Sequence, residues 1–596
     1  MKSRTPPTAT LRHSGSSVQR HSGSSAQRQG SAFQPFSCYF NACLLFLVRK
    51  ICKPLNNKLL LISSLEVGVA DKQPGIIFTR RASGLVRELS WFDVFIFVVA
   101  GPAASGVVFY SVSTAADFPA ANIPLAFIIG LAIFFPITLL VALTSATMPR
   151  SGGLYITVSR VLGPTTGFLS AWLLFIGYGI SSGVLGYLFV GLLGSAFSTA
   201  ALSAGIGWLA RLGSAMQTPL WQTVGGLLWV ALFWWIAYTG IRKVKNIMRV
   251  AFFIPLVGTV VAVVWFFSAG GIESVASGFN GTWGAGAFQA IQGRAAALGW
   301  NPPSGFSAAA TLKSLVVVVW AYASITIINY AGGEVKTPKK SMMRGFIIGT
   351  IFVGLFYVII VLSSYSAFGD FVGSYDFLYD NYPGELTAIM GDAVQPSIPF
   401  YFMSLVPNVW IGLVVAVSIM IWFANSILPG FLANSRLAFA MSMDKSFPEA
   451  LSKVNRRTGS PTNAVHLNAV FCAVGVFLML LEVEIILSIL TLTTFFIFWA
   501  YGLSAMLLPY HKPDIYKRSP VRWQIGKLPV ITILGGFTFL AGWFFIYLAL
   551  RNFSPLVMAV FVGVMLAGLI VYLYQQAKNR REGVDVNKIY SEIPPE

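Results

Sequence analysis

Glycine and proline interrupt a long apolar stretch of the sequence at Gly101–Gly106 (GPAASG), within residues 92–116. Pro102 removes one backbone N–H donor, and the two flanking glycines allow non-helical backbone angles. A helix that starts at Trp91 rises about 1.5 Å per residue, so Gly101 lies about 15 Å deep, near the middle of a bilayer core about 30 Å thick. An opened backbone at that depth requires a cavity enclosed by protein. A simple proline kink, or a seam of small residues, is the alternative interpretation.

A second apolar stretch, residues 313–332, has a polar and weakly helical centre at Ser324, Thr326 and Asn329. Small residues there alternate with Tyr322 and β-branched side chains, which weakens the preference for a regular helix. Interrupted helices at corresponding positions in two halves of a chain are typical of the binding site of a transporter. The two interruptions together therefore favour a shared pocket.

Open helix ends at such a pocket suit a zwitterionic ligand. Free N–H groups near Ala103–Gly106, at the positive end of a helix dipole, favour a carboxylate. Free carbonyl groups accept hydrogen bonds from an ammonium group. The apolar stretches of this sequence carry almost no charged side chain at the depth of the bilayer centre. The chemistry therefore predicts that a small zwitterion, such as an amino acid, binds between the two interruptions.

A helical bundle in a membrane is needed to position these residues. The chain has 596 residues, of which 10% are charged and 56% hydrophobic, whereas a soluble protein carries about 25% charged residues. The charges gather in short clusters between apolar runs, as expected for helices that cross hydrocarbon. The sequence thus predicts an all-α polytopic membrane protein. It has twelve predicted transmembrane helices, at residues 92–116, 123–147, 167–197, 219–239, 247–270, 313–332, 344–368, 408–435, 463–481, 485–509, 528–550 and 556–576.

The first and sixth spans begin two groups of five helices with opposite orientation. We therefore predict a 5+5 inverted repeat with discontinuous helices 1 and 6, plus two C-terminal helices. The predicted segments are an N-terminal tail (1–85), a first half (86–270), a second half (271–510), helices 11 and 12 (511–580) and a C-terminal tail (581–596). The N-terminal tail carries a near-repeat rich in Ser, Gly and Arg, so we expect it to be disordered, although its start also resembles a signal peptide.

The positive charges are distributed unequally between alternate loops. With a cytoplasmic N-terminus, the inner loops and C-terminal tail hold 24 Lys and Arg residues, and the outer loops hold four: Arg211, Arg294, Lys313 and Arg551. The loop after the seventh span carries five acids and no Lys or Arg. The positive-inside rule therefore predicts that both termini are cytoplasmic.

Several other classes of ligand and activity are disfavoured by composition. The net charge of +20 is divided among loops and forms no continuous basic face, which argues against nucleic acid as a partner. Four cysteines and four histidines are scattered, so the sequence predicts no metal site and no bound cofactor. The spans offer no nucleophile–base pair, so we predict that the protein is not an enzyme.

Three stretches resemble amino acid permeases of the amino acid–polyamine–organocation (APC) superfamily. They are Met148–Leu173, whose PRSGGLY sequence opens a loop and a third helix; Ala331–Lys340, with its GEVKTP element; and Asn434–Asn455 at the exit of the eighth span. The C-terminal residues 591–596 are also similar to those of such permeases. The resemblance covers the chain from about residue 85 to its end.

The resemblance implies alternating access, with a substrate site carried by the two interrupted helices. By this resemblance, the first interruption holds the substrate carboxylate, and Tyr322–Thr326 meet its ammonium group and side chain. Ser324 stands where the family usually has glycine, and Phe252 lies near the place of a lysine found in some proton-coupled members. The implied substrate-binding residues are Gly101, Ala103, Ala104, Ser105, Gly106, Tyr322, Ala323, Ser324, Ile325 and Thr326.

Further residues are candidates for ion binding and gating. Sodium-coupled relatives hold a cation between the first and eighth helices, which implies a candidate cation site at Asn425 and Ser426. A packing role for these two side chains explains them at least as well. Glu334, Arg344 and Arg436 are candidates for an inner ion-pair gate, although solvated helix ends explain them equally well.

Four aromatic residues are candidate covers of the pocket, and Tyr322 is the one that we favour. The set is Trp172, Tyr178, Trp320 and Tyr322. Most aromatic residues of membrane helices serve packing or interface anchoring instead.

The function that we predict is secondary active transport of neutral or hydrophobic amino acids across the plasma membrane, with coupling to H+ or Na+ left open. Apolar side chains at Ile325 and Ile327, and the lack of an acid at either interruption, favour such substrates. An amine or polyamine transporter, an amino acid exchanger, and a transporter-like sensor or channel are the alternatives. A channel requires a ring or repeated filter element, which the sequence does not present.

Overall fold

The structure is a computed structural model, and it describes residues 84–301, 305–481, 483–584 and 586–591. Within these residues the chain is almost entirely helical, and a two-stranded hairpin of β1 (Gln524–Ile525) and β2 (Leu528–Pro529) is its one sheet. The predicted disordered tail lies outside the described residues, apart from its last two. The segment boundaries predicted from the sequence stay predictions.

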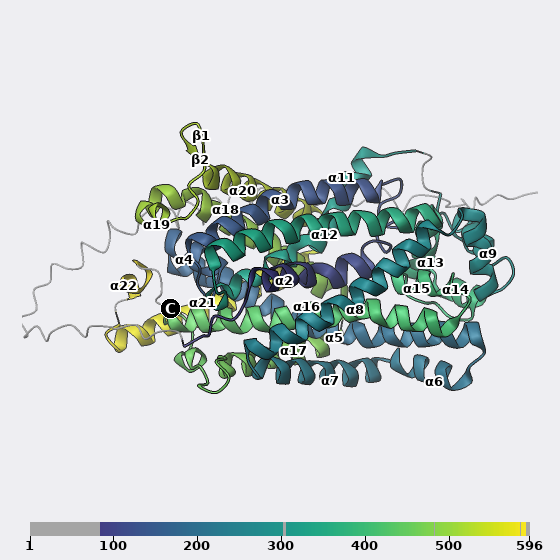
Figure 1. Ribbon diagram of the computed structural model, residues 1–596, viewed down its shortest axis with the longest axis horizontal. Helices are drawn as coiled ribbons and strands as arrows, with labels where there is room; N and C mark the ends of the chain where they lie inside the picture. Colours follow the sequence, from purple (N-terminus) through teal and green to yellow (C-terminus); the bar gives the residue numbers. More distant parts are fainter. Residues whose placement is uncertain (1–83, 302–304, 482, 585, 592–596) are drawn as a thin grey trace, which may run out of the picture. The chain divides into compact units, whose positions relative to one another are not determined.

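Helices occupy all twelve ranges that the sequence marks as spans (Figure 1). Prolines begin many of them, where a missing N–H costs nothing. The helices in these ranges are α2 (Trp91–Ala103) with η2 (Ala104–Phe109), α3 (Ile123–Thr147), α5 (Pro164–Ala204), α7 (Pro219–Tyr238), α8 (Ile241–Phe267), α11 (Ala308–Ala323) with η3 (Ser324–Tyr330), α12 (Pro338–Phe368), α16 (Val409–Met443), α17 (Thr462–Leu478), α18 (Val483–His511), α20 (Val530–Asn552) and α21 (Pro555–Arg581).

By length and apolar composition, nine helices of the described residues can cross a membrane, or ten when the bent pair at α11 and η3 counts as one span. Two helices in the predicted ranges, α2 and α17, are apolar but shorter, with 13 and 17 residues. The chain is therefore a multi-pass helical membrane protein. The exact number of twelve spans and the inverted repeat remain predictions.

Shorter helices connect the long ones, and the sequence analysis did not anticipate them. They are α4 (Leu154–Val161), α6 (Gly207–Met216), α9 (Ile272–Trp283), α10 (Ala287–Ala297), η4 (Gly332–Glu334), α13 (Phe371–Asn381), α14 (Pro383–Met390), α15 (Ile398–Met403), η5 (Glu449–Ser452), α19 (Pro513–Lys517) and α22 (Val586–Ser591).

The two ends of the helix bundle differ in charge. The end at which α2 begins carries Arg242, Lys245 and Arg249 on the first turns of α8, and we call it the basic end. The opposite end includes α9, α13, α14 and α15, which lie together in Figure 1, and we call it the acidic end because Asp376 and Asp380 lie on α13. The first and sixth spans pack against each other between these ends, and α16 contacts both.

Candidate functional site

The first span changes its helical form at the predicted interruption, but it does not unwind. The α-helix α2 ends at Ala103 and continues as the π-helical turn η2. Pro102 has no N–H to donate, so the regular hydrogen-bond pattern cannot pass through it, and a wider turn follows. The expected open coil at Gly101–Gly106 is therefore wrong in form, whereas the position of the interruption agrees with the sequence.

Hydroxyl groups of neighbouring helices satisfy the backbone at this change. The Tyr357 hydroxyl of α12 donates to the Pro102 carbonyl at 2.8 Å. The Ser426 hydroxyl of α16 donates to the Ala100 carbonyl at 2.9 Å and accepts from the Ala104 N–H at 3.3 Å. Polar backbone in the middle of a bundle needs such partners, because no bulk water reaches it.

The sixth span changes form beside the first. The α-helix α11 ends at Ala323 and continues as the tighter 3₁₀ helix η3. The span is bent by 40° between Ala308–Val319 and Ala321–Tyr330. Gly101 makes the contact between the spans possible, because a Cβ atom placed there meets the Ser324 carbonyl oxygen at 2.7 Å. The two interruptions therefore touch through backbone, and a side chain at Gly101 forces them apart.

A cavity of about 70 Å³ lies against both interruptions. Roughly 10–15 Å³ of such volume holds one water molecule, so the cavity accommodates several waters or a small solute. Every residue that lines it is uncharged, and many carry a hydroxyl group. The lining comprises Gly101, Ala104, Leu154, Leu174, Gly177, Tyr178, Ser181, Leu185, Ala323, Ser324, Thr326, Tyr330, Ser426, Leu490, Thr493, Thr494, Ile497 and Phe498.

Half of the predicted substrate-binding residues line this cavity. They are Gly101, Ala104, Ala323, Ser324 and Thr326. The side chain of Ser105 lies outside the described part of the structure.

Four of the predicted residues point elsewhere. Tyr322 stacks on Phe134 of α3 and donates its hydroxyl to the Phe127 carbonyl at 3.1 Å, so it packs the two helices together and does not cover the cavity. A Cβ atom at Gly106 overlaps the ring of Tyr357, so this glycine is needed for packing. Ala103 and Ile325 are buried away from the cavity lining. The rotation of each helix about its axis decides which side chains point into the cavity. In an apolar span, a single sequence has no periodic pattern that shows this rotation.

Four hydroxyl residues of the cavity wall were not predicted from the sequence, namely Ser181, Tyr330, Thr493 and Thr494. Tyr178 and Ser181 on α5, and Thr493 and Thr494 on α18, face the cavity with hydroxyl groups. The ring of Tyr330 lies across from Tyr178, with ring centres 6.0 Å apart, and the buried Tyr330 hydroxyl has no hydrogen-bond partner among the described residues. Hydroxyl residues inside apolar spans were the available signal, but their spacing does not show which of them face one another.

The other aromatic candidates differ from Tyr178 in position. The Trp172 indole donates to the Val564 carbonyl of α21 at 3.0 Å, so it anchors two helices to each other outside the cavity. The side chain of Trp320 lies outside the described part of the structure. Of the three aromatic candidates whose side chains the structure describes, Tyr178 is therefore the one that borders the cavity.

A buried ion pair joins α16 to η4. Arg436 of α16 donates to both carboxylate oxygens of Glu334, at 2.8 Å and 3.0 Å, and both side chains are fully buried. Arg344 is not part of this pair, because its guanidinium lies over the ring of Trp91 at 5.3 Å. Of the three predicted gate residues, two form an ion pair, and Arg344 instead makes a cation–π contact at the start of α2. Their role as a gate stays a prediction.

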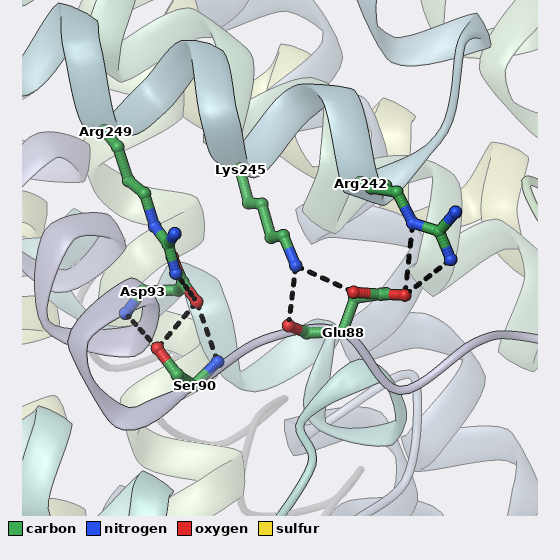
Figure 2. A network of polar contacts seen from close by, with 6 residues as sticks. All are labelled: Glu88, Ser90, Asp93, Arg242, Lys245 and Arg249. Atoms are coloured by element: carbon green, nitrogen blue, oxygen red, sulfur yellow. Dashed lines mark hydrogen bonds and ion pairs between the residues drawn. The ribbon is translucent and has the colours of Figure 1, made fainter.

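The segment before the first span is tied to the basic end. The N–H groups of Glu88 and Leu89 donate to the Glu334 carbonyl at 2.8 Å and 2.9 Å, and the Lys336 N–H donates to Leu89. Figure 2 shows that Glu88 also binds Arg242 and Lys245 of α8. These hydrogen bonds lower the pKa of Glu88 to about 2.

A second ion pair attaches the start of the first span to α8. Asp93 accepts two hydrogen bonds from Arg249, at 2.6 Å and 2.9 Å, and it forms a capping box with Ser90 (Figure 2). Asp93 therefore both caps the start of the first span and forms an ion pair. Together with Glu88, it fixes the start of the first span on α8.

The candidate cation residues do not converge on one point. Ser426 faces the first span, as described above, whereas the Asn425 amide donates to the Ala251 carbonyl of α8 at 2.8 Å. The other Asn425 atom, Oδ1, is buried without a partner in the described residues. Adjacent residues of a helix point about 100° apart, which explains the divergence. The described residues also contain no cluster of three His, Cys, Asp or Glu side chains that could hold a metal ion.

Comparisons with known proteins identify the family of the chain. The amino acid permease family matches residues 89–570 of the chain. The branched-chain amino acid permease BcaP of Bacillus subtilis (strain 168) is 21% identical over 511 residues, which cover 85% of this chain and 96% of that protein. The serine/threonine exchanger SteT of the same organism is 22% identical over 403 residues, which cover 67% of this chain and 77% of that protein.

Proposed function

The chain belongs to the amino acid permease family, and from that premise we propose that it is a secondary active transporter of neutral amino acids. Its family is one of transporters, and an enzymatic role is therefore not proposed. We further propose that it works by alternating access in the plasma membrane, with the basic end facing the cytoplasm, in keeping with the positive-inside rule.

One observation carries this proposal: the cavity lies against the interruptions of both spans and is lined by uncharged residues. The carboxylate of an amino acid needs N–H or hydroxyl donors, and its ammonium group needs carbonyl or hydroxyl acceptors. Hydroxyl groups of the lining, such as those of Ser181, Ser324 and Thr493, can both donate and accept, so they suit both ends of the ligand. The ligand therefore brings its own balanced charges, and no buried side-chain charge is required.

The uncharged lining also restricts which substrate side chains can bind. A cationic or acidic side chain in this cavity has no opposite charge to offset the loss of its hydration, which costs several kcal/mol. The named relatives act on branched-chain amino acids and on serine and threonine, and all of these are neutral. The hydroxyl groups of Tyr178, Ser181 and Thr494 favour small polar or small apolar substrates over large hydrophobic ones.

Transport measurements test the proposal. Purified protein in proteoliposomes is given radiolabelled serine, alanine or leucine, with arginine and glutamate as charged comparisons. We expect saturable uptake of at least one neutral amino acid and background uptake of arginine and glutamate. Uptake that favours arginine, or no saturable uptake of any amino acid, contradicts the proposal.

A substitution in the cavity tests whether it is the substrate site. Ser324→Trp places an indole in the cavity, so binding is expected to be lost while folded protein remains in the membrane. Normal substrate affinity in this variant contradicts the assignment of the cavity.

Preloading the liposomes with unlabelled substrate distinguishes net uptake from exchange, because an exchanger takes up labelled substrate only into preloaded liposomes.

A further inference from the structure

Asp376 of α13 differs from the other buried acids of the protein. In the described residues, Asp93, Glu334, Asp376 and Asp444 are the buried carboxylates. Three of them form ion pairs with an arginine, namely Asp93 with Arg249, Glu334 with Arg436 and Asp444 with Arg160. Asp376 is 1% exposed, and the described residues give it no cationic partner.

Asp376 joins α13 to the segment that follows the first span. Its Oδ2 atom accepts a hydrogen bond from the Ala116 N–H at 3.1 Å. One turn of α13 earlier, Gly373 lies against Ala115, since a Cβ atom placed there is 3.5 Å from that side chain. The carboxyl group of Asp376 therefore lies where α13 contacts Ala115 and Ala116, the residues that follow the first span.

Two buried oxygen atoms on α13 and α15 have no hydrogen-bond partner. The Oδ1 atom of Asp376 and the hydroxyl of Tyr401 on α15 are both buried, and neither has a hydrogen-bond partner in the described residues. The ring of Tyr401 lies 6.0 Å, between ring centres, from that of Tyr375, the residue before Asp376, and the charge of Asp376 contributes to the raised pKa of Tyr401. A further unpartnered hydroxyl, that of Tyr365, also interacts with Asp376.

The surroundings of Asp376 favour its neutral form. Burial, first, and the charges of Asp380 and Asp117 raise the pKa of Asp376 well above its ordinary range. Burial and Asp117 likewise raise the pKa of Asp380 to about 6. Arg294 of α10 is engaged by Glu385, at 2.5 Å. The titratable groups that interact with Asp376 or its neighbours are Asp117, Asp370, Asp380, Asp392, Tyr365, Tyr375, Tyr379 and Tyr401, and all of them are acids.

We propose that Asp376 is a proton-binding site of the outer face, and that its protonation holds α13 closed over the end of the first span. The outer location rests on the orientation in the proposed function. A buried carboxyl group without a cationic partner is stable only when it is neutral, so closing of α13 takes up a proton. When α13 lifts, water reaches Asp376, and the proton leaves as the carboxyl group returns to its ordinary pKa of about 4.

The direction of the pH effect follows from this difference. The pKa of Asp376 is raised in the closed form and ordinary in the open form. The population of the closed form therefore increases as the outer pH falls from above the raised pKa towards about 4. One proton per closing event changes the closed-to-open ratio by at most about tenfold per pH unit. Above the raised pKa, the charged carboxylate favours opening.

Cysteine labelling measures this closing without requiring transport. Thr114, two residues before the anchored Ala116 amide, is 1% exposed, and its hydroxyl bonds the carbonyl of Tyr110 one turn earlier. Thr114→Cys is introduced into a chain whose four native cysteines are replaced, and a membrane-impermeant maleimide is added outside. The rate is divided by that of Thr387→Cys, an exposed position on α14, which removes the pH dependence of the thiol itself.

The normalised rate is expected to fall at least threefold when the outer pH is lowered from 7.5 to 5.5. In Asp376→Asn, whose amide cannot be charged, the rate is expected to be low and independent of pH. Asp370→Asn, an exposed acid beside the same helix, should retain the pH dependence of the parent chain.

Three outcomes overturn the proposal. They are a pH dependence that survives in Asp376→Asn, a parent chain whose rate does not change with pH, and a rate that responds to sodium at fixed pH through Asp376, which would make the site a cation site. If Asp376→Asn does not fold, Asp376→Glu replaces it and must retain the pH dependence. Because labelling does not require a substrate, its failure is distinct from a failure of amino acid transport.

Discussion

Gly101 sets the distance between the two interrupted spans. Its missing side chain lets the first span approach the Ser324 carbonyl, and the cavity is bounded by this contact. The residue was found from the sequence because glycine and proline have strong backbone preferences wherever they stand. Tyr330 was not found as part of the cavity wall, and Tyr178 was named as one of four candidate covers without being favoured. An aromatic side chain in an apolar span has many packing roles, and only its neighbours decide between them.

Gly101→Ala is expected to impair transport. The added Cβ atom meets backbone at 2.7 Å, and backbone cannot swing aside as a flexible side chain does. Overpacking of this kind costs about 1–3 kcal/mol and should separate the spans. Substrate affinity measured by thermal shift should fall in this variant. Gly563→Ala is the matched control, because a Cβ atom there meets nothing within 4 Å; an equal loss in both variants contradicts the assigned role of Gly101.

At the scale of elements, the short helix α4 connects the cavity to the C-terminal end of the chain. Leu154 at its start lines the cavity, and Arg160 near its end binds Asp444, with an Nη2–Oδ1 distance of 2.9 Å. The Tyr155 hydroxyl donates to Asp444 at 2.9 Å and contacts the hydroxyl of Tyr590 on α22 at 3.1 Å. The sequence predicted a plain loop at this position, because the eight residues of this helix give too short a pattern to distinguish helix from loop.

Asp444→Asn is expected to destabilise the protein strongly. The Arg160 and Asp444 side chains are both fully buried, and removal of one partner leaves the other charge uncompensated, at a cost of about 3–5 kcal/mol. The midpoint of thermal unfolding in detergent should fall accordingly. Glu449→Gln, which breaks the exposed pair of Glu449 with Lys445, should cost at most about 1 kcal/mol. Equal effects of the two substitutions would refute the structural importance of the buried pair.

The attachment of Glu88 to α8 predicts a pH dependence with a defined sign. Its pKa is lowered from 4.5 to about 2 by hydrogen bonds from Lys245 and Arg242. A lowered pKa in the folded state means that the stabilisation is complete above about 4.5 and is lost as the pH falls through about 2. The difference in unfolding midpoint between the parent chain and Glu88→Gln should therefore be the same at pH 7 and pH 5 and should shrink below pH 4. A difference that already disappears at pH 5 contradicts this assignment.

At the scale of the whole molecule, apolar composition predicted the class of fold and the ranges of the long helices. Every predicted span contains helix, because about 20 consecutive apolar residues have few alternatives in a bilayer. The helices α9, α10, α13, α14 and α15 were not predicted, because they are short and lie between the spans, where hydropathy carries no signal. The convergence of the polar cavity wall also depends on how distant helices pack, and a single sequence does not show this.

The account depends on one claim, that an amino acid binds where the two interrupted spans meet. The most direct test is an electron cryomicroscopy map of the protein in lipid nanodiscs, recorded with and without a saturating concentration of the best substrate from the uptake measurements. The account predicts added density beside Gly101, Ala104 and Ser324, within hydrogen-bonding distance of the backbone and of the Ser426 hydroxyl. Substrate density at another place in the bundle, with an unchanged cavity between the two spans, would contradict it.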